Sequence, residues 1–175
     1  MKKGFLLLIP GLLLSTLAFP ALANKNMPAS AFFDAALCKT PYSTRHVLNL
    51  YEAAEKLSKV DKSSGAAVFH LSAPIKKNGL VAQDVVFASS TVGVLVEGNV
   101  AEKLAKQYNL APEEINITGM TGYTRQLPDA QQGLKELGLI YLVALVSGEF
   151  KDKTLLGCQF VSNEDRKNME LLNAD

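Results

Sequence analysis

The chain has 175 residues, and 18 Lys and Arg face 17 Asp and Glu, so the formal net charge at pH 7 is +1. Charge this evenly balanced gives no electrostatic reason to expect nucleic acid or an anionic membrane surface as a partner. The sequence also contains no internal repeat and no low-complexity tract. These features argue against a repeat protein or a disordered linker and favour a globular domain.

Residues 1–23 have the pattern of a secretory signal peptide. Two lysines precede an apolar run over residues 4–19, and Ala-Leu-Ala at 21–23 forms a small-x-small cleavage site. The mature chain is therefore predicted to begin at Asn24 and to be periplasmic or secreted. Export of this kind places the folded chain where disulfides form and persist.

A membrane-spanning helix is the alternative interpretation of the same apolar run. Pro10, Gly11 and Pro20 interrupt the run, so we expect cleavage and no stable membrane insertion afterwards. Removing 23 of the 175 residues leaves 152, which is long enough for one domain to bury a sizeable core. We therefore expect a single globular domain over residues 24–175.

Two helices are predicted near the start of this domain. Apolar residues fall on one side of a helix over 31–37. After Pro41, either Ser43 or Thr44 is a suitable helix start, and amphipathic spacing continues to Leu57. The second helix is expected to bury one face.

Three strands are predicted to follow. Residues 67–73 alternate as a strand, which Pro74 is expected to stop. Asn78-Gly79 is a strong turn signal, and the β-branched run over 80–87 is expected to return antiparallel to the first strand. A third apolar run covers 92–96.

The next stretch mixes helix and strand signals. Asn99 is expected to cap a helix whose apolar face extends to Tyr108. Residues 118–125 contain two glycines and are a candidate for a further strand. Residues 128–137 favour a short helix, with Gly138 as its C-terminal stop.

The last part of the chain predicts a central hairpin. Residues 139–146 are apolar at every position, which is typical of a strand covered on both faces. Residues 154–161 are expected to return antiparallel to it, and Ser162 then caps a final helix. Together these elements predict an α+β fold with a mainly antiparallel sheet of about five strands and helices packed mainly on one face.

Cys38 and Cys158 are the only cysteines in the chain. A single pair in an oxidising compartment is more typical of a disulfide than of a thiol site, so we expect these two residues to be bonded to each other. The chain has no Cys-x-x-Cys motif, and a thioredoxin-like redox role therefore lacks its signature.

The sequence offers no catalytic constellation. His46 and His70 are the only histidines, and neither lies in a zinc-binding pattern. Ser89-Ser90 lacks the flanking glycines of a nucleophile elbow, and no Gly-rich phosphate-binding motif is present. We therefore predict no catalytic residue, no metal site and no cofactor.

Residues 119–125 are the strongest candidate for a binding segment. The two glycines permit an exposed turn, and Tyr123 and Arg125 are residue types enriched at interaction hot spots. The alternative is the end of a strand in which Tyr123 packs and Arg125 is solvated.

These features lead to one main functional hypothesis and two others. The main hypothesis is an exported, non-enzymatic protein that binds a protein partner, such as an inhibitor, an immunity-like protein or an envelope-assembly factor. A small envelope hydrolase whose catalytic residues meet only in the folded chain is the first alternative. A carrier of small ligands is the second.

The predicted signal peptide can be tested directly. Because two lysines, an apolar run and the site at 21–23 act together, the exported protein should begin at Asn24. Intact-mass measurement of the exported product checks this, and a mature product that retains residues 1–23 would contradict it.

Overall fold

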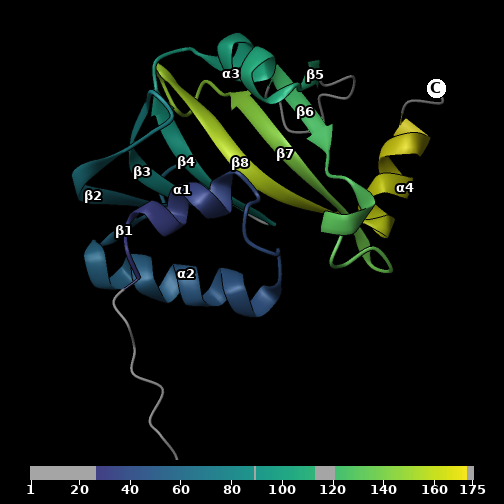
Figure 1. Cartoon of the computed structure of the whole chain (residues 1–175), viewed down its shortest axis with the longest axis horizontal. Helices are drawn as coiled ribbons and strands as arrows, with labels where there is room; N and C mark the ends of the chain where they lie inside the picture. Colours follow the sequence, from purple (N-terminus) through teal and green to yellow (C-terminus); the bar gives the residue numbers. More distant parts are fainter. Residues whose placement is uncertain (1–26, 89, 113–120, 173–175) are drawn as a thin grey trace, which may run out of the picture.

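The computed structural model describes residues 27–88, 90–112 and 121–172. The predicted signal peptide, Ser89 and the first two residues of the 119–125 segment lie outside these ranges. The described residues form four α-helices and one antiparallel sheet of eight strands (Figure 1). The predicted α+β class with a mainly antiparallel sheet is confirmed, whereas the expected number of about five strands was too low.

The sheet has the spatial order β1-β2-β3-β4-β8-β7-β6-β5. Its strands are β1 (Val60–Asp61), β2 (Ala67–Lys77), β3 (Leu80–Ala88), β4 (Thr91–Glu97), β5 (Ala111–Pro112), β6 (Thr121–Gln126), β7 (Gly138–Val146) and β8 (Lys153–Ser162). The helices are α1 (Ser30–Ala36), α2 (Thr44–Leu57), α3 (Ala101–Tyr108), the 3-10 turn η1 (Asp129–Gln131) and α4 (Asn163–Leu172).

The additional strands are the short ones at the two edges of the sheet. β1 and β5 contain two residues each, and each pairs with a single neighbour. Two residues cannot display an alternating hydrophobic pattern, so the sequence carries no signal for them. Short edge strands are also a common way to prevent edge-to-edge association of sheets.

The β2–β3 hairpin differs from the predicted one. Pro74 does not stop β2, because it lies where the register shifts between His70 and Ile75, and proline is tolerated at such an irregularity. The strand continues to Lys77, and Asn78 and Gly79 form a two-residue turn with φ of 52° and 75°. Both angles are positive, as in a type I′ turn.

The centre of the sheet agrees with the sequence analysis. β7 and β8 pair antiparallel from Gly138 opposite Ser162 to Leu145 opposite Leu155. β8 also pairs with β4 along its other edge, so the C-terminal hairpin is completed by a strand from the first half of the chain. The apolar run predicted at 139–146 is thereby buried on both faces.

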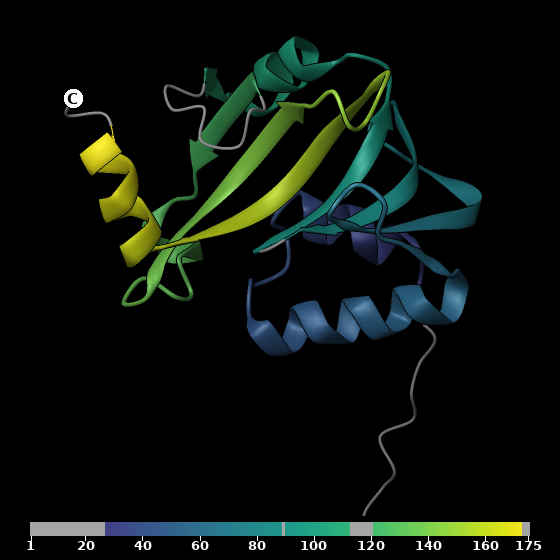
Figure 2. The ribbon, with the colours of Figure 1, turned by 180° about the vertical axis from the view of Figure 1, so that it is seen from behind.

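The main core lies between the sheet and the first three helices. Phe32 and Phe33 of α1, Leu50 of α2 and Leu104 of α3 are fully buried in the same cluster. α1 and α2 lie over one face of the sheet (Figure 1). Figure 2 views the molecule from the opposite side, and there the sheet lies in front of α1. Tyr51 helps to hold α2 in place through edge contacts with the rings of two phenylalanines of the sheet.

The opposite face of the sheet carries a smaller apolar cluster. Its members include Val86, Leu95, Val143 and Leu155, together with Phe150 from the turn between β7 and β8. This turn folds over the face that α1 and α2 leave uncovered. Both faces of the central strands are therefore shielded from water, although by different elements.

Two of the predicted helices are corrected. The residue before α3 is Val100, not Asn99, and the N–H of Val100 donates to Thr154 Oγ1 at 2.9 Å. The helix expected over 128–137 is reduced to η1, because the buried Gln132 amide bonds instead with both main-chain groups of Ile140. Side-chain bonds to the sheet thus replace the helical ones.

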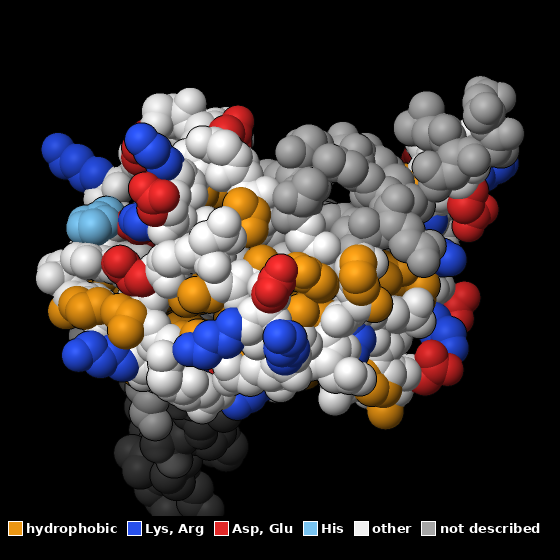
Figure 3. Space-filling model, turned by 90° about the horizontal axis from the view of Figure 1, so that it is seen from above, with side chains coloured by type: hydrophobic (Ala, Val, Ile, Leu, Met, Phe, Trp, Pro, Cys, Tyr) orange, Lys and Arg blue, Asp and Glu red, His pale blue; other side chains and the backbone are white. Residues whose placement is uncertain are grey.

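Charged side chains are interspersed on the surface. Seen from the α3 end, Lys and Arg alternate with Asp and Glu, and several hydrophobic side chains lie between them (Figure 3). The large apolar residues that are exposed are spread over α2, β1, the segment before β7 and α4: Leu48, Leu57, Val60, Leu137 and Leu171. Scattered exposure of this kind is ordinary for a folded domain.

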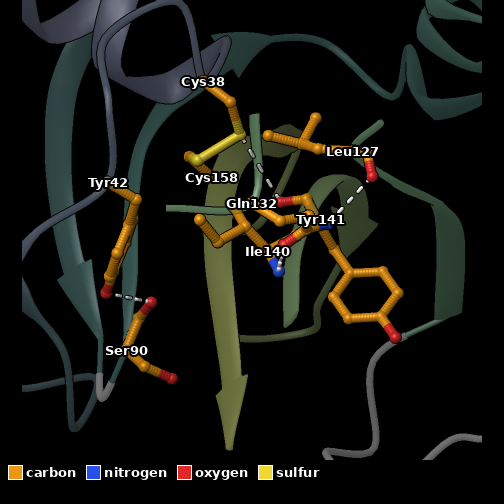
Figure 4. The surroundings of a disulfide bond; sticks show 8 residues. All are labelled: Cys38, Tyr42, Ser90, Leu127, Gln132, Ile140, Tyr141 and Cys158. Atoms are coloured by element: carbon orange, nitrogen blue, oxygen red, sulfur yellow. Dashed lines mark hydrogen bonds between the residues drawn. A yellow bond between two sulfur atoms is a disulfide. The ribbon is translucent and has the colours of Figure 1, made fainter. Parts of the chain in front are cut away.

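A disulfide joins Cys38 and Cys158, as predicted (Figure 4). Cys38 follows α1 with a positive φ of 52°, and Cys158 lies in β8 at the centre of the sheet. The two Cα atoms are 5.1 Å apart across a sequence separation of 120 residues. The bond therefore fixes the link between α1 and α2 to the middle of the sheet.

Loss of this bond should destabilise the fold strongly. In the chain-entropy model, closing a loop of this length stabilises a protein by about 4 to 5 kcal/mol. A Cys38→Ala/Cys158→Ala double variant should lose stability of that order in denaturant unfolding monitored by circular dichroism. Two free thiols in denatured, non-reduced wild-type protein would contradict the bond itself.

Candidate functional site

The described part of the chain contains a cavity of about 530 Å³ beside the disulfide, on the helix-covered side of the sheet. The α1–α2 link forms one wall, and η1 with the end of β6 forms another. Its lining residues are Leu37, Cys38, Lys39, Thr40, Pro41, Tyr42, Tyr108, Arg125, Leu127, Ala130, Gln131, Gly133, Ile140, Leu142 and Cys158. The cavity thus collects residues from five separate segments of the chain.

The floor of the cavity is apolar. Ile140 and Leu142 of β7 point to the same face because side chains alternate along a strand, and both are at most 2 % exposed. Leu127 and the sulfur of Cys158 complete this floor. A surface of this composition favours contact with an aliphatic or aromatic group over contact with water.

The rim of the cavity is polar and positively charged. Lys39 and Arg125 line it, and the lining residues include no Asp or Glu. Arg125 Nε donates to the main-chain oxygen of Tyr108, the last residue of α3, at 3.1 Å. Carbonyl groups at a helix C-terminus lack partners within the helix and favour a nearby cation, so this bond holds the guanidinium in place.

Two hydroxyl groups in the wall behave differently. Tyr42 donates through its phenol to the main-chain oxygen of Ser90 at 2.6 Å, and Figure 4 shows the ring beside this contact. Burial raises the pKa of Tyr42, so the phenol stays protonated at neutral pH and remains a donor. Thr40 Oγ1 is buried but has no hydrogen-bond partner among the described residues.

The structure places the two residues that the sequence singled out for binding on one face of β6, but only one of them lines the cavity. Arg125 lines the cavity, whereas Tyr123, two residues earlier on the same face of β6, packs half-buried against the main core. Tyr123 is not part of the cavity wall. The binding role of both residues remains a prediction, but their surroundings now differ.

Sequence reasoning missed the other polar residues of the rim. Lys39, Thr40 and Tyr108 lie in a helix link and at a helix end, where no periodicity or motif marks them. Their proximity depends on the disulfide, which holds the α1–α2 link against β8. The only signal available was that Lys39 and Thr40 follow Cys38 directly. A disulfide from Cys38 to a distant strand also places the residues next to Cys38 near that strand.

A second group of polar side chains lies on the opposite face of the sheet. Asp84 is 5 % exposed, and its carboxylate contacts His70 Nδ1 at 2.7 Å and Lys153 Nζ at 2.5 Å. A carboxylate that orients a histidine also occurs in hydrolases. In the described ranges, however, no Ser, Thr or Cys side chain is hydrogen-bonded to His70. The arrangement corresponds to a buried carboxylate that is paired with Lys153 and hydrogen-bonded to His70.

The other histidine is enclosed in a different way. His46 Nε2 is buried in the first turn of α2 and has no partner among the described residues. Burial lowers the pKa of His46 below its ordinary value of 6.5.

Within residues 27–88, 90–112 and 121–172, no group of three His, Cys, Asp or Glu could hold a metal ion. None of the helices in these ranges has both the length and the apolarity to span a membrane.

The chain was compared with protein-family models, with curated proteins and with solved structures, and none of the three comparisons gave a match. The geometry of the described residues is therefore the basis on which a function can be proposed.

The Asp84 cluster yields a stability prediction. Asp84→Asn removes the carboxylate between His70 and Lys153 while keeping the side-chain volume. Because this removes hydrogen bonds to a buried charge, we expect a loss of about 1 to 3 kcal/mol in the free energy of unfolding.

Asp129→Asn is the matched control for this prediction. Asp129 also contacts a lysine, Lys135, at 2.7 Å, but both side chains are more than half exposed. Its replacement should change stability by less than about 0.5 kcal/mol. Equal effects of the two substitutions in urea unfolding would show that burial of Asp84 contributes nothing.

Proposed function

We propose that this is an exported, non-enzymatic binding protein whose site is the cavity beside the disulfide, occupied by a small molecule with an apolar body. The observation that carries the proposal is the combination of an apolar floor with a polar rim in about 530 Å³. Ligand sites in proteins usually have volumes of roughly 300 to 1,000 Å³ and this distribution of polar groups.

The proposal favours a small-ligand carrier over an inhibitor or assembly factor that uses a flat surface. A flat hot spot would present Tyr123 and Arg125 side by side to a partner. In this fold Tyr123 is half-buried against the core, and Arg125 contributes to a concave wall. This arrangement supports recognition of a group that enters the cavity.

The envelope hydrolase receives less support. The His70–Asp84 pair is the nearest approach to an acid–base constellation, and it lies on the sheet face that carries Val86. The cavity lies on the other face, so substrate bound there would be separated from this pair by the sheet. A binding role uses the cavity without requiring any group from the opposite face.

An extracytoplasmic location fits the same proposal. The pattern of residues 1–23 predicts export, and the disulfide is compatible with an oxidising compartment. The disulfide also contributes to the cavity wall through both of its cysteines. The compartment that allows the bond would therefore also preserve the shape of the site.

A pair of glycine substitutions tests the proposal. Gly133 lines the cavity, and a Cβ added there meets no atom nearer than 3.9 Å, so Gly133→Phe should fill the cavity without straining the main chain. The uncharged fluorescent probe N-phenyl-1-naphthylamine should bind saturably to the wild-type protein. Gly133→Phe should abolish this binding, because the new ring occupies the space of the probe.

Gly148→Phe is the matched control. Gly148 lies between β7 and β8, outside the cavity lining, and a Cβ added there meets nothing within 4 Å. This variant should bind the probe as the wild type does, and circular dichroism with thermal melting would establish that both variants are folded. Undiminished probe binding by folded Gly133→Phe would place the site elsewhere and reject the proposal.

A further inference from the structure

We infer that the cavity is built for an apolar carboxylate: a small organic acid whose hydrocarbon part lies on the floor and whose carboxylate meets Arg125. This inference rests on the proposed function and adds the chemical class of the ligand. It is carried by the charge of the rim, the hydrogen-bond donors of Arg125 and the apolar composition of the lining.

The charge of the lining residues differs from that of the whole chain. The chain is almost electrically neutral, but among the described residues the cavity is lined by Lys39 and Arg125 and by no acidic residue. The nearest described carboxylate to Lys39 is Asp34, whose Oδ1 is 4.0 Å from the lysine nitrogen and is shared with a closer partner, Lys77. A concave site with positive charge attracts and concentrates anions.

Arg125 carries more donors than its one hydrogen bond to a described residue uses. The Arg125 side chain makes one hydrogen bond to a described residue, in which Nε donates to the main-chain oxygen of Tyr108. The guanidinium carries five N–H donors in a planar fork, which matches the two oxygens of a carboxylate. Fixing one donor reduces the conformational freedom that would be lost when an anion binds.

The floor determines the rest of the ligand. Leu127, Ile140 and Leu142 offer only apolar side-chain atoms, and the disulfide beside them carries no proton to donate. These residues are at most 4 % exposed, so the apolar lining surface that is still open to water belongs to other residues, among them the exposed Pro41 and Ala130 and the half-buried Tyr42. Inorganic phosphate or sulfate would leave that surface in water. A hydrocarbon chain or ring attached to the carboxylate would cover it, with a gain that grows with the apolar area removed from water.

Competition binding tests the inference with decanoate and decanol, which share a hydrocarbon chain and differ in charge. Each should displace N-phenyl-1-naphthylamine from the oxidised, mature protein. Decanoate should bind about tenfold to a hundredfold more tightly than decanol, which is the range expected for hydrogen bonds to a charged group. Arg125→Gln should remove this preference while leaving decanol binding unchanged.

Two further variants serve as controls. Arg125→Lys keeps the charge without the planar fork and should restore part of the preference that Arg125→Gln lacks. Arg45→Gln removes an exposed arginine of α2 that does not line the cavity, and it should bind decanoate as the wild type does. Thermal melting of each variant separates loss of binding from loss of folding.

The outcomes separate the inference from the proposed function. Equal affinities for decanol and decanoate, or an unchanged preference in folded Arg125→Gln, would overturn the carboxylate and leave the apolar site standing. Competition by inorganic phosphate as effective as that by decanoate would overturn the need for a hydrocarbon part. Failure of the probe and of decanol to bind at all would overturn both, because the cavity itself would then hold no apolar group.

Discussion

The covalent bond between Cys38 and Cys158 is the constraint on which the arrangement of the molecule depends. It attaches the link between α1 and α2 to β8, the strand that lies between the two halves of the sheet. Phe32 and Phe33 of the preceding helix are fully buried against the same sheet. Because link and strand are held together, the residues that follow Cys38 become a wall of the cavity rather than a free loop.

The two faces of the sheet hold their polar groups in different ways. On the helix-covered face, apolar side chains are buried around a concave region that has polar groups at its rim. On the other face, Asp84 is buried, pairs with Lys153 and forms a hydrogen bond with His70. Burying a charge is costly unless it is paired, so the second arrangement serves the fold, while the first leaves donors available to a ligand.

Local signals in the sequence were sufficient for several elements. Ser43 accepts a hydrogen bond from the main chain of His46 at the start of α2, and Ser162 does the same for Asp165 at the start of α4. The continuous apolar run at 139–146 also has the burial expected of a central strand. In each case the information lies within a few neighbouring residues, which is the range over which capping and periodicity act.

Features that depend on distant residues could not be predicted. Gln132 prevents the helix expected over 128–137 by bonding to Ile140, and the burial of Asp84 depends on a lysine 69 residues away. Arg125 was identified as a binding residue from its type alone. Its place in a cavity depends on α3, on the disulfide and on the α1–α2 link. The residues next to Arg125 in the sequence carry no signal for contacts with these distant segments.

The position of β8 has a consequence for the order in which the chain can fold. β8 contributes the strand between β4 and β7 and carries Cys158, yet it lies near the end of the 175-residue chain. During synthesis, which starts at the N-terminus, β1 to β4 can pair early, but one edge of β4 has no partner until β8 has been made. Contacts between distant parts of a chain are slow to form, and the bond between Cys38 and Cys158 can form only after β8 has been synthesised.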